Sequence, residues 1–371
     1  MKYVKWMLAA FILQFLCLTT IGMSTENVNL FTPDNKLIQM QGRINCAKPL
    51  RPEISNAGAY IRFNFSGTSC ALLLDDQNLW GTNYNYISVV IDNQYKGRVK
   101  VTKDQHYYSI ASDLADSIHS VIVCKATESQ NGYIAFLGIV CKQLLASPPL
   151  PKRKIEFIGN SITCGMGDDT KEIPCGTGQW FDQHNAWFAY GPRVARALNA
   201  DYILNSVSGI GMTRNWNSEG PTMPNVYDNL FLNTDSTLKY DPTRFQPDLI
   251  SICLGTNDFS DGDNSYDRKE LDSTKFVTDY IQSIKRLRAR SPHAPICCLT
   301  SPATSRQKNS TLEVYLSAIV NYMQQAENDN NVYMYSFSRF FTGGCSGHPN
   351  INDHELMTKE LIPFYKKVMN W

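Results

Sequence analysis

The sequence has no excess of charge of either sign. Its 35 lysine and arginine residues and its 34 aspartate and glutamate residues leave a net charge of +1 at pH 7. No run of basic residues stands out along the chain. Proteins that bind nucleic acid or an acidic membrane surface carry a basic patch or stripe, so this composition argues against both kinds of partner.

Long apolar runs are absent beyond the N-terminus. There, Lys2 and Lys5 accompany an apolar stretch at residues 6–18 that only Gln14 interrupts, and small and polar residues follow as far as Ser24. This pattern is typical of an export signal and is too short for a membrane-spanning helix. We therefore predict a signal peptide at residues 1–24, export to the periplasm or the extracellular space, and no membrane span.

The cysteines and histidines show no spacing that resembles a zinc site, so we expect neither a metal nor another cofactor. Of the eleven cysteines, Cys17 would leave with the signal peptide. An exported protein can pair the others in disulfides. Cys164 and Cys175 flank one loop and are our candidate pair. Those in strand-like apolar runs are more simply interpreted as buried thiols, and they are Cys70, Cys124, Cys141, Cys253, Cys297 and Cys298.

The chain of 371 residues, 43% of them hydrophobic, is long enough for two packed domains. Residues 38–145 consist of short strand-like segments between turns. Residues 60–65 alternate with a period of two, and residues 86–91 are mostly apolar and β-branched. We predict an all-β sandwich or jelly-roll domain at residues 28–147. The proline-rich segment 147–151 then forms a stiff boundary.

Residues 151–371 alternate strands with helices. Apolar stripes at helical spacing indicate the helices, and a capping box at Ser310 and Glu313 predicts the start of one of them. This alternation implies a parallel sheet with helices on both faces, and therefore a three-layer α/β domain. The predicted strands are 154–158, 201–205, 249–254, 295–299 and 332–336.

Three polar blocks follow three of these strands, and a fourth precedes the last helix. Sites in parallel sheets lie at the carboxyl ends of the strands, so the first three blocks should meet at one edge. The blocks are Gly159-Asn160-Ser161, Asn205-Ser206-Val207-Ser208-Gly209, Leu254-Gly255-Thr256-Asn257-Asp258 and Gly347-His348-Pro349.

In this order the four blocks resemble the SGNH, or GDSL-type, hydrolase superfamily, where a serine, a glycine, an asparagine and a histidine come from successive blocks. The β domain sharpens the resemblance, because a small β-sandwich followed by an SGNH domain is similar to carbohydrate esterase family 2. Members of that family remove acetyl groups from plant-wall polysaccharides. The matching segments are 57–63 and 67–69 in the sandwich, 209–212 and 221–224 in the SGNH loops, and 345–349 around the histidine.

The resemblance makes Ser161 the nucleophile, and a serine hydroxyl needs a base to take its proton. His348 lies in a glycine-rich loop, as the superfamily pattern requires, and is our preferred base. His354, expected in the first turn of the last helix, is the alternative. The other histidines are assigned to the β domain (His106 and His119), to a turn before a strand (His293) and to a capping or surface role at a helix start (His184).

The chain lacks the acid that most SGNH enzymes place two or three residues before the histidine. Ser346 and Cys345 occupy those positions, and neither carries a carboxylate. We expect a main-chain carbonyl to accept the ring N–H and fix the tautomer, which leaves a Ser–His dyad. Asp353 is the nearest carboxylate, but a helix start should direct it away from the ring.

The resemblance also predicts an oxyanion hole. Its donors are the backbone N–H groups of Ser161 and Gly209 and the side-chain amide of Asn257. Asp258 is expected to support the loop rather than to take part in the chemistry. Trp216 and Trp180 are the predicted substrate-binding residues, since indole rings stack on sugar faces.

Together these features predict a secreted serine esterase that removes O-acetyl groups from xylan, mannan or their oligosaccharides through an acyl-enzyme. Two alternatives stay open. A GDSL-type lipase or thioesterase would need an apolar acyl channel, whereas the loop after Gly209 is polar. A carbohydrate-binding protein with weak or no catalysis is compatible with the missing acid.

Overall fold

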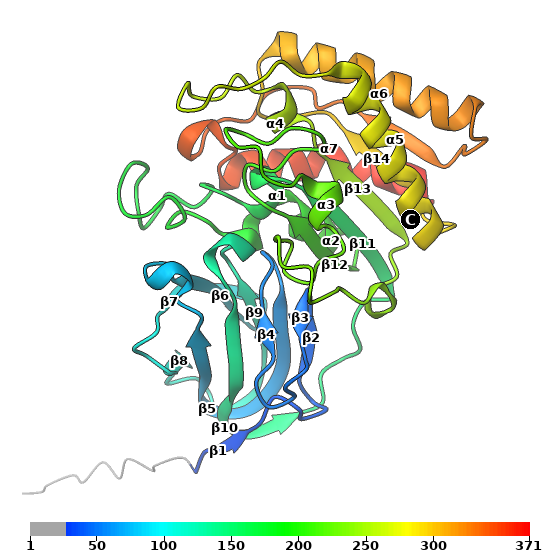
Figure 1. Cartoon of the computed structure of the whole chain (residues 1–371). Coiled ribbons are helices and arrows are strands. Elements are labelled where there is room, and N and C mark those ends of the chain that lie inside the picture. The colour runs from blue at the N-terminus through cyan, green and yellow to red at the C-terminus, as the bar shows by residue number, and fades with distance from the viewer. Residues whose placement is uncertain (1–26) are drawn as a thin grey trace, which may run out of the picture.

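The computed structural model describes residues 27–371 (Figure 1). The predicted signal peptide at residues 1–24 lies outside the described residues. The chain forms two adjoining domains, an antiparallel β domain and an α/β domain, and the fold class predicted from the sequence is confirmed. No helix in residues 27–371 has both the length and the apolar character needed to cross a bilayer.

The β domain is one connected antiparallel sheet of ten strands. Its longest strand, β5, pairs with β10 along most of its length, with β9 through its first half and with β8 through its second half. The strands are β1 (Asn29–Phe31), β2 (Gln39–Gln41), β3 (Ile44–Asn45), β4 (Glu53–Ile54), β5 (Tyr60–Asp76), β6 (Asn85–Ile91), β7 (Gln94–Val101), β8 (Tyr107–Ala111), β9 (Ser117–Lys125) and β10 (Ile134–Leu145).

Alternation along the strands decides which side chains form the core of the β domain. On β5, Phe63 and Phe65 are fully buried while Asn64 between them is not. Strand β6 differs because both of its faces are covered. Val89 belongs to the core of the β domain, whereas Val90 packs in a cluster with side chains of the α/β domain. A continuous apolar run on β6 therefore reflects domain contact on its second face.

The α/β domain contains five parallel strands in the order β12-β11-β13-β14-β15. Each predicted strand is present, with ends that differ by one residue at most. They are β11 (Arg153–Gly159), β12 (Ala200–Ser206), β13 (Leu249–Cys253), β14 (Ile296–Leu299) and β15 (Val332–Tyr335).

Helices cover both faces of this sheet (Figure 1). Helices α2 (Tyr190–Ala197) and α7 (Ile351–Met369) contribute to one apolar cluster, and α5 (Ser273–Arg290) and α6 (Arg306–Gln325) contribute to the other. Short helices lie in the connections. These are α1 (Ser161–Cys164), α3 (Met223–Val226), α4 (Thr256–Phe259) and the single-turn helices η3 (Ala186–Phe188), η4 (Pro242–Arg244) and η5 (Cys345–Gly347). Among them, α1, α4 and η5 include residues of three of the polar blocks.

The predicted start of α6 was wrong by several residues. The N-cap is Ser305, whose side chain accepts from the backbone N–H of Lys308, so Ser310 and Glu313 lie inside the helix. There the Ser310 hydroxyl donates to the carbonyl of Arg306, which is the usual alternative for a serine within a helix.

Buried hydrogen bonds join the two domains. Arg43 of the β domain is fully buried and donates to the side chain of Asn205 at 2.7 Å and to the carbonyl of Asn229 at 2.8 Å. Asn56 donates to the carbonyl of Leu204 at 2.8 Å. A buried guanidinium is tolerated only with such partners, so the domains have one preferred arrangement. Two further bonds across the boundary join Tyr60 to Asp201 and Ser88 to Asn185.

Candidate active site

The turn after β11 presents Ser161 at the first position of α1. Asn160 caps this helix, and its side chain accepts from the N–H of Ile162 at 3.1 Å. Gly159 is required there because an added Cβ would lie 2.0 Å from the Thr163 hydroxyl. The tight turn leaves Ser161 only 5% exposed, at the carboxyl edge of the sheet.

His348 meets Ser161 although 187 residues separate them in the chain. Its Nε2 lies 2.8 Å from Ser161 Oγ. Its Nδ1 lies 3.1 Å from the carbonyl oxygens of both Cys345 and Ser346. Carbonyl oxygens only accept, so Nδ1 carries the proton and Nε2 presents its lone pair to the serine hydroxyl. A main-chain carbonyl thus occupies the place of the missing acid.

The nearest carboxylate in sequence points elsewhere. Asp353 belongs to the capping box of α7 and accepts from the N–H groups of Asn350 at 3.1 Å and Gly343 at 2.7 Å. His354 is fully buried in the first turn of α7, where its Nδ1 accepts from the N–H of Tyr190. Burial lowers the pKa of His354 to about 3, so this ring is a neutral packing residue.

The surroundings of His348 favour its neutral form. Burial lowers the pKa of His348 below the ordinary value of 6.5, and the neighbouring His184 adds to this shift, whereas the carbonyls of Cys345 and Ser346 and the charge of Glu128 oppose it in part. A base must be unprotonated to accept the serine proton, so the shift keeps His348 competent at mildly acidic pH.

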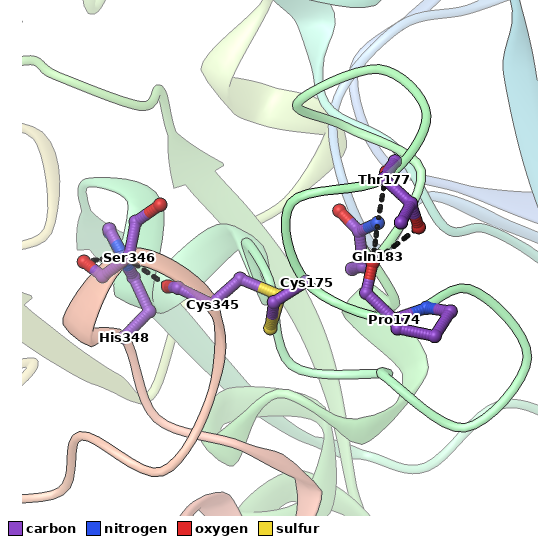
Figure 2. Close-up of a disulfide and its surroundings, with 7 residues drawn as sticks. All are labelled: Pro174, Cys175, Thr177, Gln183, Cys345, Ser346 and His348. Atoms are coloured by element: carbon purple, nitrogen blue, oxygen red, sulfur yellow. Dashed lines mark hydrogen bonds between the residues drawn. A yellow bond between two sulfur atoms is a disulfide. The ribbon is translucent and has the colours of Figure 1, made fainter.

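The disulfide predicted between Cys164 and Cys175 is wrong in one partner. Cys175 pairs with Cys345, 170 residues away (Figure 2). Cys164 instead points into the interior from α1, with its Sγ 3.2 Å from the hydroxyl of Ser206. The two cysteines are close in sequence, but the strand-to-helix turn directs the side chain of Cys164 into the interior.

The disulfide fixes the residue whose carbonyl orients the base. Figure 2 shows Cys345 between the disulfide and His348. On the other side of the bond, the amide of Gln183 donates to the carbonyls of Pro174 and Thr177 and holds the Cys175 loop together. The bond therefore ties a braced loop to the turn that carries His348.

Two backbone N–H groups at the site are left without an acceptor. Within residues 27–371 the N–H groups of Ser161 and Gly209 make no hydrogen bond, whereas those of Ile162, Ser208 and Ile210 do. Buried and half-buried N–H groups are nearly always paired. Unpaired donors next to a serine–histidine pair are the arrangement that an oxyanion would complete.

Asn257, the third predicted donor, lies on α4 and is 7% exposed. One N–H of its amide donates to the carbonyl of Ile210 at 2.7 Å, which fixes the amide and leaves its second N–H available. The adjacent Asp258 accepts from the N–H groups of Met212, Thr213 and Arg214, so it holds the loop after Gly209, as expected.

The two predicted sugar-stacking residues are accessible. Trp216 and Trp180 are each 43% exposed. The N–H of Trp216 donates to the carbonyl of Gly209 at 2.8 Å, which attaches this residue to the candidate oxyanion loop. Trp180 packs edge-on against His184, with the ring centroids 5.0 Å apart.

His184 is not the capping or surface residue that the sequence predicted. It is fully buried, with its Nε2 3.5 Å from Oε1 of Glu128, a buried glutamate of the β domain. Burial alone would raise the pKa of Glu128, but its interactions with His184 and with Ser208 hold that pKa below the usual value. Nothing in the sequence marked Glu128, since its partners lie in the other domain.

Within residues 27–371 no group of three or more histidine, cysteine, aspartate or glutamate side chains is arranged to hold a metal ion.

Comparison with known families accounts for both domains. Residues 40–149 match the family described as Carbohydrate esterase 2 N-terminal, and residues 157–357 match the GDSL-like Lipase/Acylhydrolase family.

Two curated relatives match across both domains. The Cellulase/esterase CelE of Acetivibrio thermocellus is 30% identical over 91% of this chain, which spans 40% of the length of that protein. An Acetylxylan esterase / glucomannan deacetylase of Cellvibrio japonicus is 29% identical over 88% of this chain and 89% of its own length.

Solved structures of similar proteins share the two-domain fold. A family two carbohydrate esterase from Clostridium thermocellum, in complex with cellohexaose, is 29% identical with a TM-score of 0.80, over 90% of this chain and 99% of its own. A family two carbohydrate esterase from Cellvibrio japonicus is 25% identical with a TM-score of 0.82, over 93% of this chain and 99% of its own. The chain belongs to the GDSL-like lipase/acylhydrolase family, in the two-domain form of carbohydrate esterase family 2.

Proposed function

We propose that this protein is a serine esterase that removes O-acetyl groups from plant-wall polysaccharides such as xylan or mannan, or from their oligosaccharides. The observation that carries the proposal is the 2.8 Å contact between Ser161 Oγ and His348 Nε2, together with the backbone N–H groups of Ser161 and Gly209, which have no acceptor in the described part of the chain. The names of the relatives supply the substrate class.

In the proposed reaction, His348 Nε2 takes the proton of Ser161 as Oγ attacks the acetyl carbonyl carbon. The N–H groups of Ser161 and Gly209 and the amide of Asn257 hold the resulting oxyanion. The intermediate collapses and expels the sugar alkoxide, which receives the proton from His348. Water activated by His348 then hydrolyses the acetyl-enzyme, which releases acetate and restores the serine.

The loop that follows Gly209 is polar and adjoins a polar cavity. A polar cavity of about 290 Å³ adjoins this loop, and its lining includes Thr213, Arg214 and Asn215. The apolar cavity bounded by Ile158 and Met212 is much smaller, at about 30 Å³. Neither cavity is lined by Ser161 or His348, so the preference for a carbohydrate over a lipid rests on the relatives and on the polar loop after Gly209.

Acetate release tests the proposal against both alternatives. The protein is incubated with acetylated xylan, acetylated glucomannan and para-nitrophenyl esters of increasing acyl length. An acetyl esterase releases acetate from a polysaccharide and loses activity as the acyl chain grows. Preference for long acyl esters would indicate a lipase or thioesterase, and binding of the polysaccharides without acetate release would indicate a carbohydrate-binding protein.

We also propose that the protein is exported through its N-terminal segment, since its polymeric substrates lie outside cells. Expression of the full chain with detection of the N-terminal sequence of the mature protein tests this. A mature chain that begins near residue 25 supports export, and an intact N-terminus in the cytoplasm contradicts it.

Replacing Asn257 with alanine is expected to lower kcat by about 10²–10³, the usual cost of one oxyanion donor, and to leave KM nearly unchanged. Asn257→Asp, which keeps the shape but presents no N–H, should show a similar loss. Steady-state kinetics on para-nitrophenyl acetate measure both constants. A change confined to KM would show that Asn257 binds substrate rather than the oxyanion.

The acid limb of the kcat/KM profile should have its midpoint below 6.5, the ordinary pKa of histidine, because burial lowers the pKa of His348. The acid limb shifts to lower pH for two reasons. Protonated His348 cannot act as a base, and desolvation keeps the ring neutral to a lower pH than in water. Rates on an uncharged acetate ester from pH 4 to 8 measure the midpoint. A midpoint at or above 6.5 would indicate a carboxylate partner.

A further inference from the structure

Two side chains of the β domain cross the domain boundary to the residue that precedes Gly209. Glu128 Oε2 accepts from the N–H of Ser208 at 2.6 Å, and the amide of Gln130 donates to the carbonyl of Ser208 at 2.7 Å. Both lie at the turn around η2 (Ser129–Asn131). The main chain at Ser208 is thus held on both sides from the other domain.

The second of these bonds fixes the direction of an oxyanion donor. The carbonyl of Ser208 and the N–H of Gly209 belong to one planar peptide unit, and in a trans peptide they point in opposite directions. No cis peptide occurs within residues 27–371. Holding the carbonyl toward Gln130 therefore aims the N–H of Gly209 away from it, at the side where it lacks an acceptor.

Within residues 27–371 the Ser208–Gly209 peptide unit itself makes no hydrogen bond other than the one from Gln130. Gly209 has a φ of +76° and no side chain, so rotation about its bonds is cheap. The Ser208 hydroxyl contacts the sulfur of Met166 at 3.7 Å, a weak acceptor, and interacts with the carboxylate of Glu128, but neither contact involves the Ser208 carbonyl. Within residues 27–371, Gln130 is the only donor to the Ser208 carbonyl.

Glu128 of the β domain anchors the same loop through the N–H of Ser208. It is fully buried, and its Oε2 also accepts from the thiol of Cys164 at 3.6 Å. Cys164 ends the short helix that begins with Ser161, so one carboxylate contacts both the nucleophile helix and the oxyanion loop. The turn that carries both side chains is held in place, since Lys125 donates to the carbonyl of Glu128 and Asn83 to that of Gln130.

We propose that the β domain completes the oxyanion hole, with Gln130 as the residue that positions the Gly209 N–H and Glu128 as the anchor of the loop. This inference rests on the proposed esterase function. The N–H of Gly209 is used only when charge develops on the substrate oxygen, so its misalignment should lower kcat and leave KM unchanged.

Gln130 carries the test, because its side chain is exposed and we expect its replacement to leave the fold intact, whereas a change at buried Glu128 risks unfolding. Gln130→Met removes the donor at nearly constant size, and Gln130→Lys restores a donor on a straight chain. The matched control is Gln105→Met, since the exposed amide of Gln105 donates to the carbonyl of Tyr107 within the same domain. Active sites are titrated with an organophosphonate, and kcat is expressed per titrated site.

We expect Gln130→Met to lower kcat about tenfold and to change KM by no more than about twofold. This loss of kcat is smaller than that caused by removing an oxyanion donor completely, because the Gly209 N–H is misaligned rather than lost. Gln130→Lys should recover most of the lost kcat. Gln105→Met should match the wild-type protein. The inference is overturned if Gln130→Met retains full kcat, if only KM changes, or if Gln130→Lys is equally impaired. Failure of the proposed function would appear separately, as a wild-type protein that hydrolyses no acetate ester.

Discussion

Replacing Ser161 with alanine is expected to abolish ester hydrolysis while the protein stays folded. Loss of a serine nucleophile costs about 10⁶ in kcat in a well-studied serine hydrolase, and a loss of at least about 10⁴ is expected here. The only side-chain partner of Ser161 Oγ within residues 27–371 is His348 Nε2, so no structural bond depends on it. Hydrolysis of para-nitrophenyl acetate and thermal unfolding are the two measurements.

Thr163→Val provides the matched control for that variant. Thr163 lies on the same short helix, and its hydroxyl bonds that of Tyr190 at 3.0 Å rather than the histidine. Loss of this hydroxyl should lower the free energy of unfolding by about 1 kcal/mol and leave kcat per active site unchanged. Near-normal hydrolysis by folded Ser161→Ala would remove Ser161 from the reaction. Retained binding of acetylated polysaccharide by that variant would separate binding from chemistry.

The sequence sufficed for the parts of the structure that depend on local pattern. The five parallel strands follow from apolar runs, and the blocks after them fall at one edge because parallel strands share a direction. The missing acid was also visible, since Cys345 and Ser346 stand where an aspartate would. A carbonyl was the remaining acceptor, and both residues supply one at 3.1 Å.

The errors concern contacts between segments that are distant in sequence. Cys175 pairs with Cys345 rather than Cys164 because α1 directs Cys164 inward, which depends on the packing of the turn rather than on spacing. His184 was placed at the surface, yet Glu128 of the other domain meets it in the interior. A polar side chain is buried only where a partner pairs with it, and here that partner lies in a distant segment, so the local sequence around His184 could not predict its burial.

Replacing His348 with alanine is expected to reduce kcat as severely as the loss of Ser161, by about 10⁴ or more, because His348 Nε2 is the only side-chain partner of Ser161 Oγ within residues 27–371. The double variant with Ser161→Ala should cost little more than either change alone, since the two side chains act as one unit. His354→Ala removes a buried ring and should lower the free energy of unfolding by about 1–3 kcal/mol while the folded enzyme retains its chemistry. Active-site titration combined with thermal unfolding separates these results.

Asp353→Asn decides whether the dyad works without an acid. Its Oδ2 accepts from Asn350 and Gly343, and asparagine keeps an acceptor oxygen for that cap. We expect kcat to stay within about threefold of wild type and the pH profile to overlay it, whereas loss of a triad acid costs about 10⁴. A collapse of kcat in folded Asp353→Asn would mean that this carboxylate turns toward His348 during turnover. Retained activity would leave the carbonyls of Cys345 and Ser346 as the groups that orient the ring, and the imidazolium formed during each step would then be stabilised by main-chain dipoles and by the charge of Glu128 rather than by a hydrogen-bonded carboxylate.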